Sequence, residues 1–221
     1  MSLSVVNLTI SNTSVSTEPQ VLIDALNFNV DNGEVLTIMG PSGCGKSTLL
    51  SAIAGHLTPA FSLSGEVTLH GNGILMLEPN ERRVGILFQD DLLFPHLNVW
   101  ENLAFGLPRE IRHPARRARA YATLAEIELT ELAEKMPSEI SGGQRARISL
   151  MRTLLSEPHA LLLDEPFSKL DKALRETFRT FVFNQIKHSN IPAVMVSHDN
   201  ADIPTNGVVL NWPWTQGATN A

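Results

Sequence analysis

The sequence predicts an α/β fold in which a β-rich part precedes a parallel sheet with helices. Three observations predict it. An apolar strand over residues 35–39 leads through a glycine-rich loop into a helical run over 48–54. Short apolar runs at 160–163 and 193–196 are typical of parallel strands that are buried on both faces. In the first third of the chain, apolar runs alternate with hairpin-type turn residues instead.

Composition limits the classes of protein that remain possible. The chain has 221 residues, of which 43% are hydrophobic and 18% are charged, so it can bury a core. A net charge of −6 argues against nucleic acid as the main partner. The single cysteine excludes an internal disulfide and fits a reducing compartment. No run approaches 18 apolar residues and no secretory signal opens the chain, so we expect a soluble protein.

The first part of the chain is expected to form a β-rich lobe. We interpret Asp31-Asn32-Gly33 as a hairpin turn, and His70-Gly71-Asn72-Gly73 as a second one. The expected strands are residues 5–10, 21–30, 66–69, 74–77 and 84–88.

From Asn98 to about residue 135 the pattern becomes helical. Asn98 and Glu101 predict a capping box at the first helix, and a second helix is expected over 115–129. A last strand is expected over 208–210. Two later helices are expected to bury the stripes Ile148, Met151 and Leu155, and Leu170, Leu174, Phe178, Phe181 and Ile186.

The loop after strand 35–39 is the most informative feature of the sequence. Its glycines let successive N–H groups face one anion, and the following helix adds its partial positive charge. Lys46 is expected to reach the β- and γ-phosphates of a nucleotide, and Ser47 to offer its hydroxyl to Mg²⁺. The loop matches G-x-x-x-x-G-K-[ST] and reads Gly40, Pro41, Ser42, Gly43, Cys44, Gly45, Lys46, Ser47 and Thr48. The sequence therefore predicts a nucleoside triphosphate site.

Cys44 lies within this loop. We interpret it as a small side chain that fits, with its thiol near the nucleotide. Thiol modification is then expected to inhibit the protein, and ATP to protect it.

Two carboxylates, Asp164 and Glu165, follow the apolar strand at 160–163. Ligands bind at that edge of an open α/β sheet. Asp164 is expected to hold Mg²⁺, directly or through water. Glu165 is expected to orient and deprotonate the attacking water, a contribution of about 10²–10⁴-fold in rate.

A second helix start follows Ile140, and it reads Ser141-Gly142-Gly143-Gln144. It can cradle an anion, although plain N-capping by Ser141 is the favoured explanation if this motif stands alone. Two phosphate-type helix starts with one phosphate loop indicate that two chains pair head to tail, each closing the nucleotide of the other.

Together these motifs resemble an ATP-binding-cassette (ABC) ATPase over essentially the whole chain. The resemblance implies an α/β core of the P-loop NTPase type, an antiparallel β lobe and an α-helical subdomain. The subdomain, about residues 90–140, is inserted in a single domain, 1–221. The matching motifs are the Walker A loop at 40–48, the Q-loop at Gln89, the signature at 140–144, the Walker B strand at 161–165, the D-loop at 168–171 and the switch histidine, His198.

The resemblance also implies roles for single residues. It assigns Gln89 to Mg²⁺, to the attacking water and to contact with a membrane partner. It assigns Asp171 to communication between two sites, and His198 to the γ-phosphate. From the residues alone, a lone histidine after an apolar strand is more often structural. The signature residues that the resemblance brings to the nucleotide of the opposite subunit are Ser141, Gly142, Gly143 and Gln144.

The sequence departs from the family pattern in three respects. Ile140 stands where leucine is usual, and Lys169 replaces a small residue of the D-loop. The family usually stacks adenine on an aromatic side chain of the first β hairpin. Before Lys46 the only aromatic residue is Phe28, and residues 10–17 contain none. We therefore expect weak discrimination between ATP and GTP.

Residues 88–102 resemble the Q-loop region of bacterial importers for thiamine, iron, oxyanions, polyamines or sugars. The resemblance implies a subunit that dimerises on two Mg·ATP and powers import through integral membrane permease subunits. It also implies an extracytoplasmic solute-binding protein and a peripheral place on the cytoplasmic face of the inner membrane. Leu92, Leu93, Phe94 and Leu97 either form a groove for a permease helix or pack under the helical insert.

Other readings remain open. A P-loop kinase or GTPase is disfavoured by residues 141–144 and by the absence of an Asn-Lys-x-Asp element. A cassette ATPase of DNA repair or translation usually carries a second cassette or a long coiled coil, which this chain lacks. A basic run forms either a solvated helix face or a contact with anionic lipid, and it consists of Arg109, Arg112, Arg116, Arg117 and Arg119.

Overall fold

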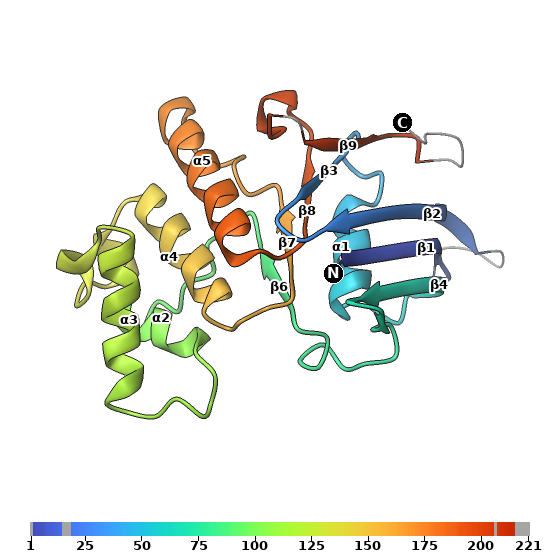
Figure 1. Ribbon diagram of the computed structural model, residues 1–221. Helices are drawn as coiled ribbons and strands as arrows, with labels where there is room; N and C mark the ends of the chain where they lie inside the picture. The colour runs from blue at the N-terminus through green and yellow to red at the C-terminus, as the bar shows by residue number, and fades with distance from the viewer. Residues whose placement is uncertain (1, 15–18, 206, 215–221) are drawn as a thin grey trace. The chain divides into compact units, whose positions relative to one another are not determined.

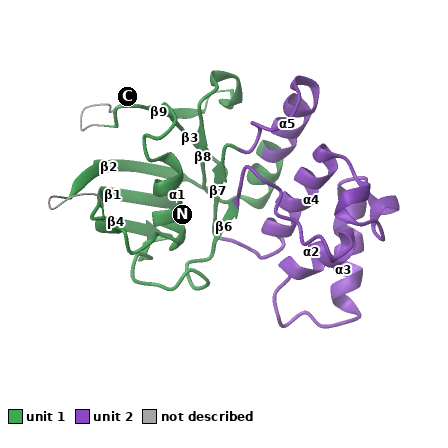
Figure 2. Ribbon diagram, turned by 180° about the vertical axis from the view of Figure 1, so that it is seen from behind, with its two compact units in different colours: residues 1–86, 159–165, 183–221 green, residues 87–158, 166–182 purple. Residues whose placement is uncertain are grey.

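The computed structural model describes residues 2–14, 19–205 and 207–214 (Figure 1). The chain divides into two compact units (Figure 2). Unit 1 comprises residues 1–86, 159–165 and 183–221, and unit 2 comprises 87–158 and 166–182. Each unit has a hydrophobic cluster of its own. Unit 2 contains the whole segment 90–140, which the family resemblance assigns to a helical subdomain.

Unit 1 contains an antiparallel sheet with the strand order β2-β1-β4-β5. The β4–β5 hairpin confirms the predicted turn after Leu69, but residues 74–77 do not form the strand that we expected. The last residue of β1, Asn12, is paired with Gln20 on one side and with Phe61 on the other. The strands are β1 (Ser2–Asn12), β2 (Gln20–Asp31), β4 (Phe61–Leu69) and β5 (Asn72–Gly73).

The second sheet has five strands in the order β6-β7-β8-β3-β9 and confirms the α/β class. Strand β8 pairs in parallel with β7 and β3, and β3 with β9. All five residues of β3 and of β8 are buried, as the continuous apolar runs predict. The strands are β3 (Val35–Met39), β6 (Val84–Leu87), β7 (Ala160–Asp164), β8 (Ala193–Ser197) and β9 (Val208–Asn211).

The hairpin predicted at Asp31-Asn32-Gly33 is wrong, because β2 and β3 belong to different sheets. The residues do form a tight turn, with Gly33 at a φ of +76°. Gly33 donates its N–H to the carbonyl of Ile191, 3.1 Å away. The turn residues therefore predict the reversal of the backbone, whereas the partner of β3 is decided by burial against β8.

Helix α1 (Lys46–Ala54) joins the two sheets of unit 1 in one hydrophobic cluster, through Leu49, Leu50 and Ile53. The carbonyls at its C-terminal end accept from Arg82, which is only 7% exposed. The same guanidinium donates to the carbonyls of Leu75 and Leu77. Arg82 thus fastens the segment after β5 to the end of α1, a role that the sequence does not reveal.

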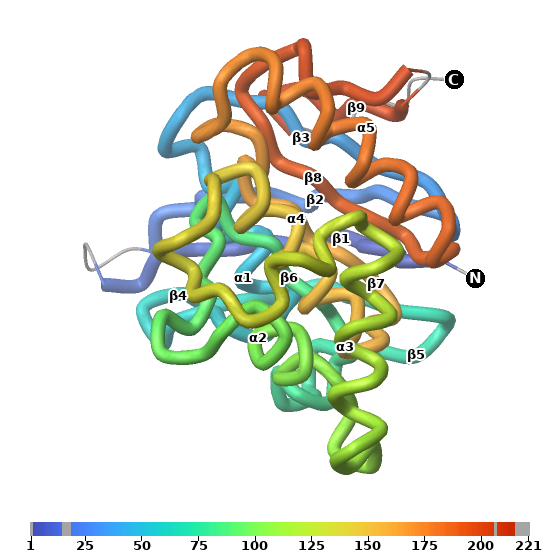
Figure 3. The backbone as a smooth tube through the Cα atoms, turned by 90° about the vertical axis from the view of Figure 1, so that its left-hand side faces the viewer, coloured from blue at the N-terminus to red at the C-terminus, as the bar shows by residue number. Residues whose placement is uncertain are grey.

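Unit 2 is helical. Figure 3 shows α2 beside α3, and residues of both helices belong to the hydrophobic cluster of unit 2. The capping box at Asn98 and Glu101 is confirmed, with each side chain accepting from the backbone N–H of the other residue. Helix α5 runs from unit 2 into unit 1. The helices are α2 (Val99–Gly106), α3 (Ala115–Glu126), α4 (Gly142–Leu154) and α5 (Lys172–Ser189), with 3₁₀ turns at Thr130–Leu132 and Pro137–Glu139.

Two sequence-based expectations for unit 2 need correction. Leu174 does not belong to the buried stripe of α5, because it is 41% exposed. Arg116 is not a solvated side chain, because its guanidinium donates to the carbonyls of Ile111, Ala104, Leu107 and Pro108. No helix in the described part of the chain combines the length and apolar character that crossing a bilayer requires.

Candidate functional site

The phosphate loop lies between β3 and α1, as the sequence predicts. Gly45 adopts a φ of +100°, a backbone angle that residues other than glycine rarely adopt. A Cβ atom at this position would also lie 2.8 Å from Cγ of Leu22 on β2. Leu49 donates its N–H to the Gly45 carbonyl over 2.9 Å, so the helix begins directly behind this residue. Glycine at 45 is therefore required both for the turn and for the close approach of β2.

Lys46 lies inside the loop and is only 6% exposed. Its Nζ donates to the carbonyl of Gly40 at 2.7 Å and to that of Pro41 at 3.0 Å. An ammonium group carries three N–H donors. These two carbonyls hold the positive charge of Lys46 at the N-terminus of α1. The helix macrodipole also favours an anion there.

Ser47 and Asp164, which the sequence predicts as holders of Mg²⁺, lie next to each other. Ser47 Oγ donates to Asp164 Oδ1 across 3.0 Å. Two neighbouring oxygen ligands of an octahedral Mg²⁺ lie about 3 Å apart, since each lies about 2.1 Å from the ion. The pair therefore fits Mg²⁺. Within the described ranges, no group of three or more His, Cys, Asp or Glu side chains could hold a metal ion.

Burial raises the pKa of Asp164 above its ordinary value, and the neighbouring charge of Glu165 adds to the rise. The hydrogen bond from Ser47 and the charge of Lys46 oppose it. A dication bound between Ser47 and Asp164 would favour the ionised carboxylate, so this environment suits a metal ligand.

Glu165 lies at the end of β7 with a φ of +46°, a conformation that non-glycine residues rarely adopt. Its N–H donates to the carbonyl of Val196 on β8, 3.1 Å away, which holds the strand end in place. The carboxylate Oε1 lies 3.3 Å from Nδ1 of His198. The sequence predicts both residues at this sheet edge, but it does not predict their contact.

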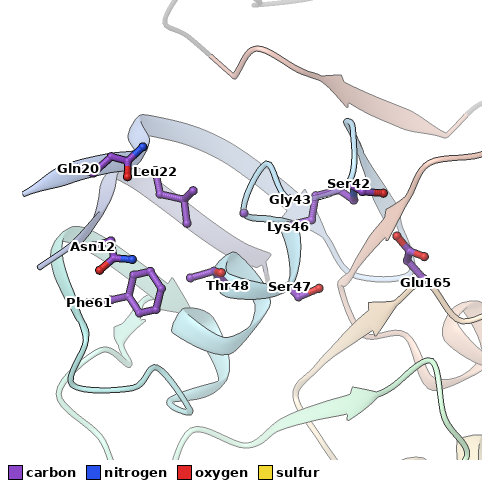
Figure 4. A pocket seen from close by; sticks show the side chains of 11 residues that line it. Asn12, Gln20, Leu22, Ser42, Gly43, Lys46, Ser47, Thr48, Phe61 and Glu165 are labelled. Atoms are coloured by element: carbon purple, nitrogen blue, oxygen red, sulfur yellow. The ribbon is translucent and has the colours of Figure 1, made fainter. Parts of the chain in front are cut away.

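A cavity of about 520 Å³ opens beside these residues, within the range of small-molecule sites. In Figure 4 the side chains of Phe61 and Asn12 lie at one end of its wall and Glu165 at the other, with Thr48 between them. The lining residues are Asn12, Gln20, Leu22, Ser42, Gly43, Gly45, Lys46, Ser47, Thr48, Phe61 and Glu165.

Four of these residues are absent from the sequence-based prediction: Asn12, Gln20, Leu22 and Phe61. They come from three strands of the antiparallel sheet, and only the pairing of those strands brings them together. Phe61 follows Lys46 in the chain, whereas the family resemblance implies an aromatic residue before the loop. Residues 15–17 of the segment 10–17, which contains no aromatic residue, lie outside the described ranges.

The thiol of Cys44, which the sequence places near the nucleotide, does not line the cavity. Its side chain is 8% exposed, belongs to the hydrophobic cluster of unit 1 and is not part of the cavity wall. Only the backbone of Cys44 is available for a phosphate. Because the thiol is buried, alkylation requires a local opening of the loop.

The signature residues belong to unit 2, at the start of α4. Ser141 Oγ accepts from the N–H of Gln144 at 3.3 Å, and Gln144 Oε1 accepts from the N–H of Ser141 at 2.8 Å. The N-capping that the sequence allows for Ser141 is therefore present. Asp171 caps α5 in a similar way, accepting from the N–H groups of Ala173 and Leu174. For the signature residues 141–144 and for Asp171, contact with a nucleotide stays a prediction.

Gln89 also belongs to unit 2, where a cavity of about 160 Å³ is lined by Gln89, Asp91, Gly142 and neighbouring residues. Asp91 Oδ2 lies 2.8 Å from Arg145 Nε on α4. Lys169, which replaces a small residue of the family, forms an ion pair with Asp90. The segment after Gln89 is thus tied to the signature helix and to the D-loop.

The sequence leaves open whether the apolar residues after Gln89 form a groove for a permease helix or pack under the helical insert. The structure shows some of them buried and some exposed. Leu93 is buried, at 8% exposure, whereas Leu92 is 54% and Phe105 is 63% exposed. The rings of Phe94 and Phe105 lie 4.5 Å apart. Fully buried Asn102 holds the segment by accepting from the N–H of Phe94 and donating to nearby carbonyls.

The loop, its lysine and the two carboxylates define a nucleoside triphosphatase of the P-loop class. More narrowly, residues 23–168 match the family model described as ABC transporter, and the chain belongs to this family of ATPases. An ABC transporter ATP-binding protein of Escherichia coli K12, YnjD, is 45% identical over 204 residues, or 92% of this chain and 94% of its own.

Two import proteins are also similar. The thiamine import ATP-binding protein ThiQ of Escherichia coli K12 is 42% identical over 200 residues, 87% of this chain and 84% of its own. The sulfate/thiosulfate import ATP-binding protein CysA of Bradyrhizobium diazoefficiens is 45% identical over 185 residues, 81% of this chain. The match spans 53% of CysA, so this chain covers about half the length of that relative.

Proposed function

We propose that this ATPase binds Mg·ATP, pairs head to tail with a second copy, and powers the import of a small polar solute through separate membrane subunits. The observation that carries the proposal is a cavity of unit 1 lined by Lys46, Ser47 and Glu165. Asp164 is hydrogen-bonded to Ser47 at its edge. Each of these side chains has the chemistry that phosphoryl transfer to water needs.

In the proposed reaction the loop N–H groups and Lys46 hold the β- and γ-phosphates. Ser47 and Asp164 hold Mg²⁺, which offsets negative charge on the phosphates. Glu165 accepts a proton from the attacking water as the water oxygen bonds to the γ-phosphorus and the bond to the ADP oxygen breaks. His198, 3.3 Å from the Glu165 carboxylate, orients this base and contacts the γ-phosphate.

The second copy supplies the signature residues. The N–H groups at the start of α4, a helix of 13 residues, are suited to the γ-phosphate of the opposite nucleotide. Ser141, Gly142, Gly143 and Gln144 make this contact in our proposal, Asp171 links the two sites, and Gln89 approaches Mg²⁺ and the attacking water.

The names of the import relatives support the transport role. One name contains thiamine and the other sulfate/thiosulfate, so these relatives agree on import and differ in the transported solute. We propose permease subunits and an extracytoplasmic solute-binding protein as partners, and a peripheral place at the cytoplasmic face of the inner membrane. Exposed Leu92 and Phe105 are the proposed contact with the permease.

Purification of the tagged chain from detergent-solubilised native membranes tests this function. We expect an integral membrane protein to co-purify in a fixed ratio, and Mg²⁺-dependent phosphate release from ATP in the complex. Co-purification with ribosomes or DNA, without any integral membrane protein, contradicts the transport role. Transfer of the γ-phosphate to a small acceptor instead of water contradicts the hydrolytic one.

A further inference from the structure

One end of the nucleotide cavity is built by a row of residues across three strands. Asn12 at the end of β1 is paired with Gln20 of β2 and with Phe61 of β4, and all three line the cavity. Directly paired residues of antiparallel strands project to the same face of a sheet. The row therefore places one aromatic ring and two amides together at the end remote from Glu165 (Figure 4).

We propose that Phe61 is the surface on which the base of the nucleotide stacks. The inference rests on the proposed function, and it names a residue from β4 where the family resemblance implies one from the first hairpin. Phe61 is half-buried, so its ring is anchored in the cluster of unit 1 while part of it remains open to the cavity. Base–aromatic stacking needs only one accessible face of the ring.

The direction of the cavity supports this assignment. Lys46 and Ser47 mark the position of the phosphates, and Thr48 lies between them and Phe61 in Figure 4. A nucleotide with its phosphates on the loop must direct its base either toward this row or toward solvent. Leu22 adds an apolar side chain to the same wall, next to Gly45.

Asn12 suits either purine. Its Oδ1 accepts from the N–H of Ser14 at 2.9 Å, so Nδ2 is the amide group that remains for a ligand. Figure 4 shows that nitrogen on the side of Thr48. A donor pairs with ring nitrogen N7, an acceptor that adenine and guanine share and pyrimidines lack. The row thus favours purines and separates ATP from GTP only weakly.

Phe28 offers a matched control. It is the only aromatic residue before the loop, it lies half-buried in β2 of the same sheet, and it packs on the same cluster. Phe28 does not line the cavity. Phe28→Leu and Phe61→Leu therefore remove the same ring and keep an apolar side chain, but only the second change touches the proposed base site.

The test measures binding of ATP and of inorganic tripolyphosphate, both with Mg²⁺, to the full-length chain by calorimetry. We expect Phe61→Leu to weaken ATP binding by about 5- to 100-fold. Tripolyphosphate binding is expected to stay within about twofold, because it has no base. Phe61→Tyr and Phe28→Leu are expected to bind both ligands like the original chain.

Equal ATP affinity in Phe61→Leu and in the original chain overturns the inference and leaves the proposed function standing. An equal loss for ATP and tripolyphosphate also overturns it, because the change then disturbs the loop. If neither ligand binds the original chain, the proposed function itself fails.

Binding of different nucleotides to the chain without substitutions gives a second test, which a folding defect of a variant cannot affect. We expect ATP and GTP to bind within about fivefold of each other and UTP to bind at least about fivefold more weakly than both, since stacking and the Asn12 donor both favour purines. UTP binding as tight as ATP binding overturns the inference.

Discussion

Glu165 concentrates the proposed chemistry in a single side chain. Its backbone has a positive φ and is bonded to β8, so the position of the carboxylate is set by two neighbouring strands rather than by a loop. A residue held in a rarely populated conformation is often part of a functional site. Here the conformation brings the carboxylate into the cavity wall and next to His198.

Glu165→Gln is expected to lower kcat at least about 100-fold, because a carboxamide cannot accept the proton of water. Nucleotide binding is retained, and the ATP-bound dimer accumulates because it no longer turns over. Phosphate release at saturating Mg·ATP and sedimentation with ATP measure the two effects. Glu126→Gln, an exposed change on α3, is the control, and retained turnover in Glu165→Gln would mean that another group is the base.

Asp164 makes stability depend on pH in the absence of nucleotide. The pKa of Asp164 is raised in the folded protein. Its contribution to stability is therefore fully present when the pH is below its pKa in the unfolded chain, and is lost as the pH rises through its pKa in the folded protein. Asp164→Asn removes the ionisable group and keeps an acceptor for Ser47. We expect Tm to rise by about 1–3 °C at pH 7 and the difference to shrink near pH 4. An unchanged or lower Tm at pH 7 contradicts this reading.

Elements in this protein are joined by buried polar side chains that no sequence motif marks. Arg82 ties the segment after β5 to the end of α1, and Asn102 ties the segment after Leu93 to α2. Both bond mainly to backbone carbonyls. Such contacts depend on the position of chain segments, which residue types alone do not encode.

Arg82→Ala is expected to destabilise the protein by about 3 kcal/mol, since it leaves four carbonyls without their charged donor. This corresponds to a fall in Tm of about 6–12 °C. Arg83→Ala, at the next and exposed position, is the control and should change Tm by less than about 2 °C. Similar losses for both variants would refute the special role of Arg82.

Phe105→Asp tests the proposed permease contact on α2. The side chain is 63% exposed, so a carboxylate there should fold normally but place a charge on an apolar contact. We expect the variant to lose the co-purifying membrane protein while its Tm falls by no more than about 5 °C, through loss of the ring contact with Phe94. Met76→Asp, at a position 97% exposed in unit 1, should retain the partner. Full recovery of the partner with Phe105→Asp excludes this contact.

For the whole molecule, the sequence predicts what is local in the chain. The phosphate loop, the strand before it, the two carboxylates and the capping box at Asn98 are contiguous patterns with a direct physical reason. The pairing of strands is different, because it depends on residues far apart. The absence of a β2–β3 hairpin, the place of Phe61 beside Asn12 and the inward direction of Cys44 all follow from such packing.

The central proposal is that the signature residues of unit 2 complete the nucleotide site of a second chain. The rate of ATP hydrolysis per chain, measured from nanomolar to micromolar concentration with sedimentation under the same conditions, tests it most directly. We predict that this rate rises with concentration and levels off once dimers predominate. A rate per chain that is constant and high while every molecule sediments as a monomer contradicts it.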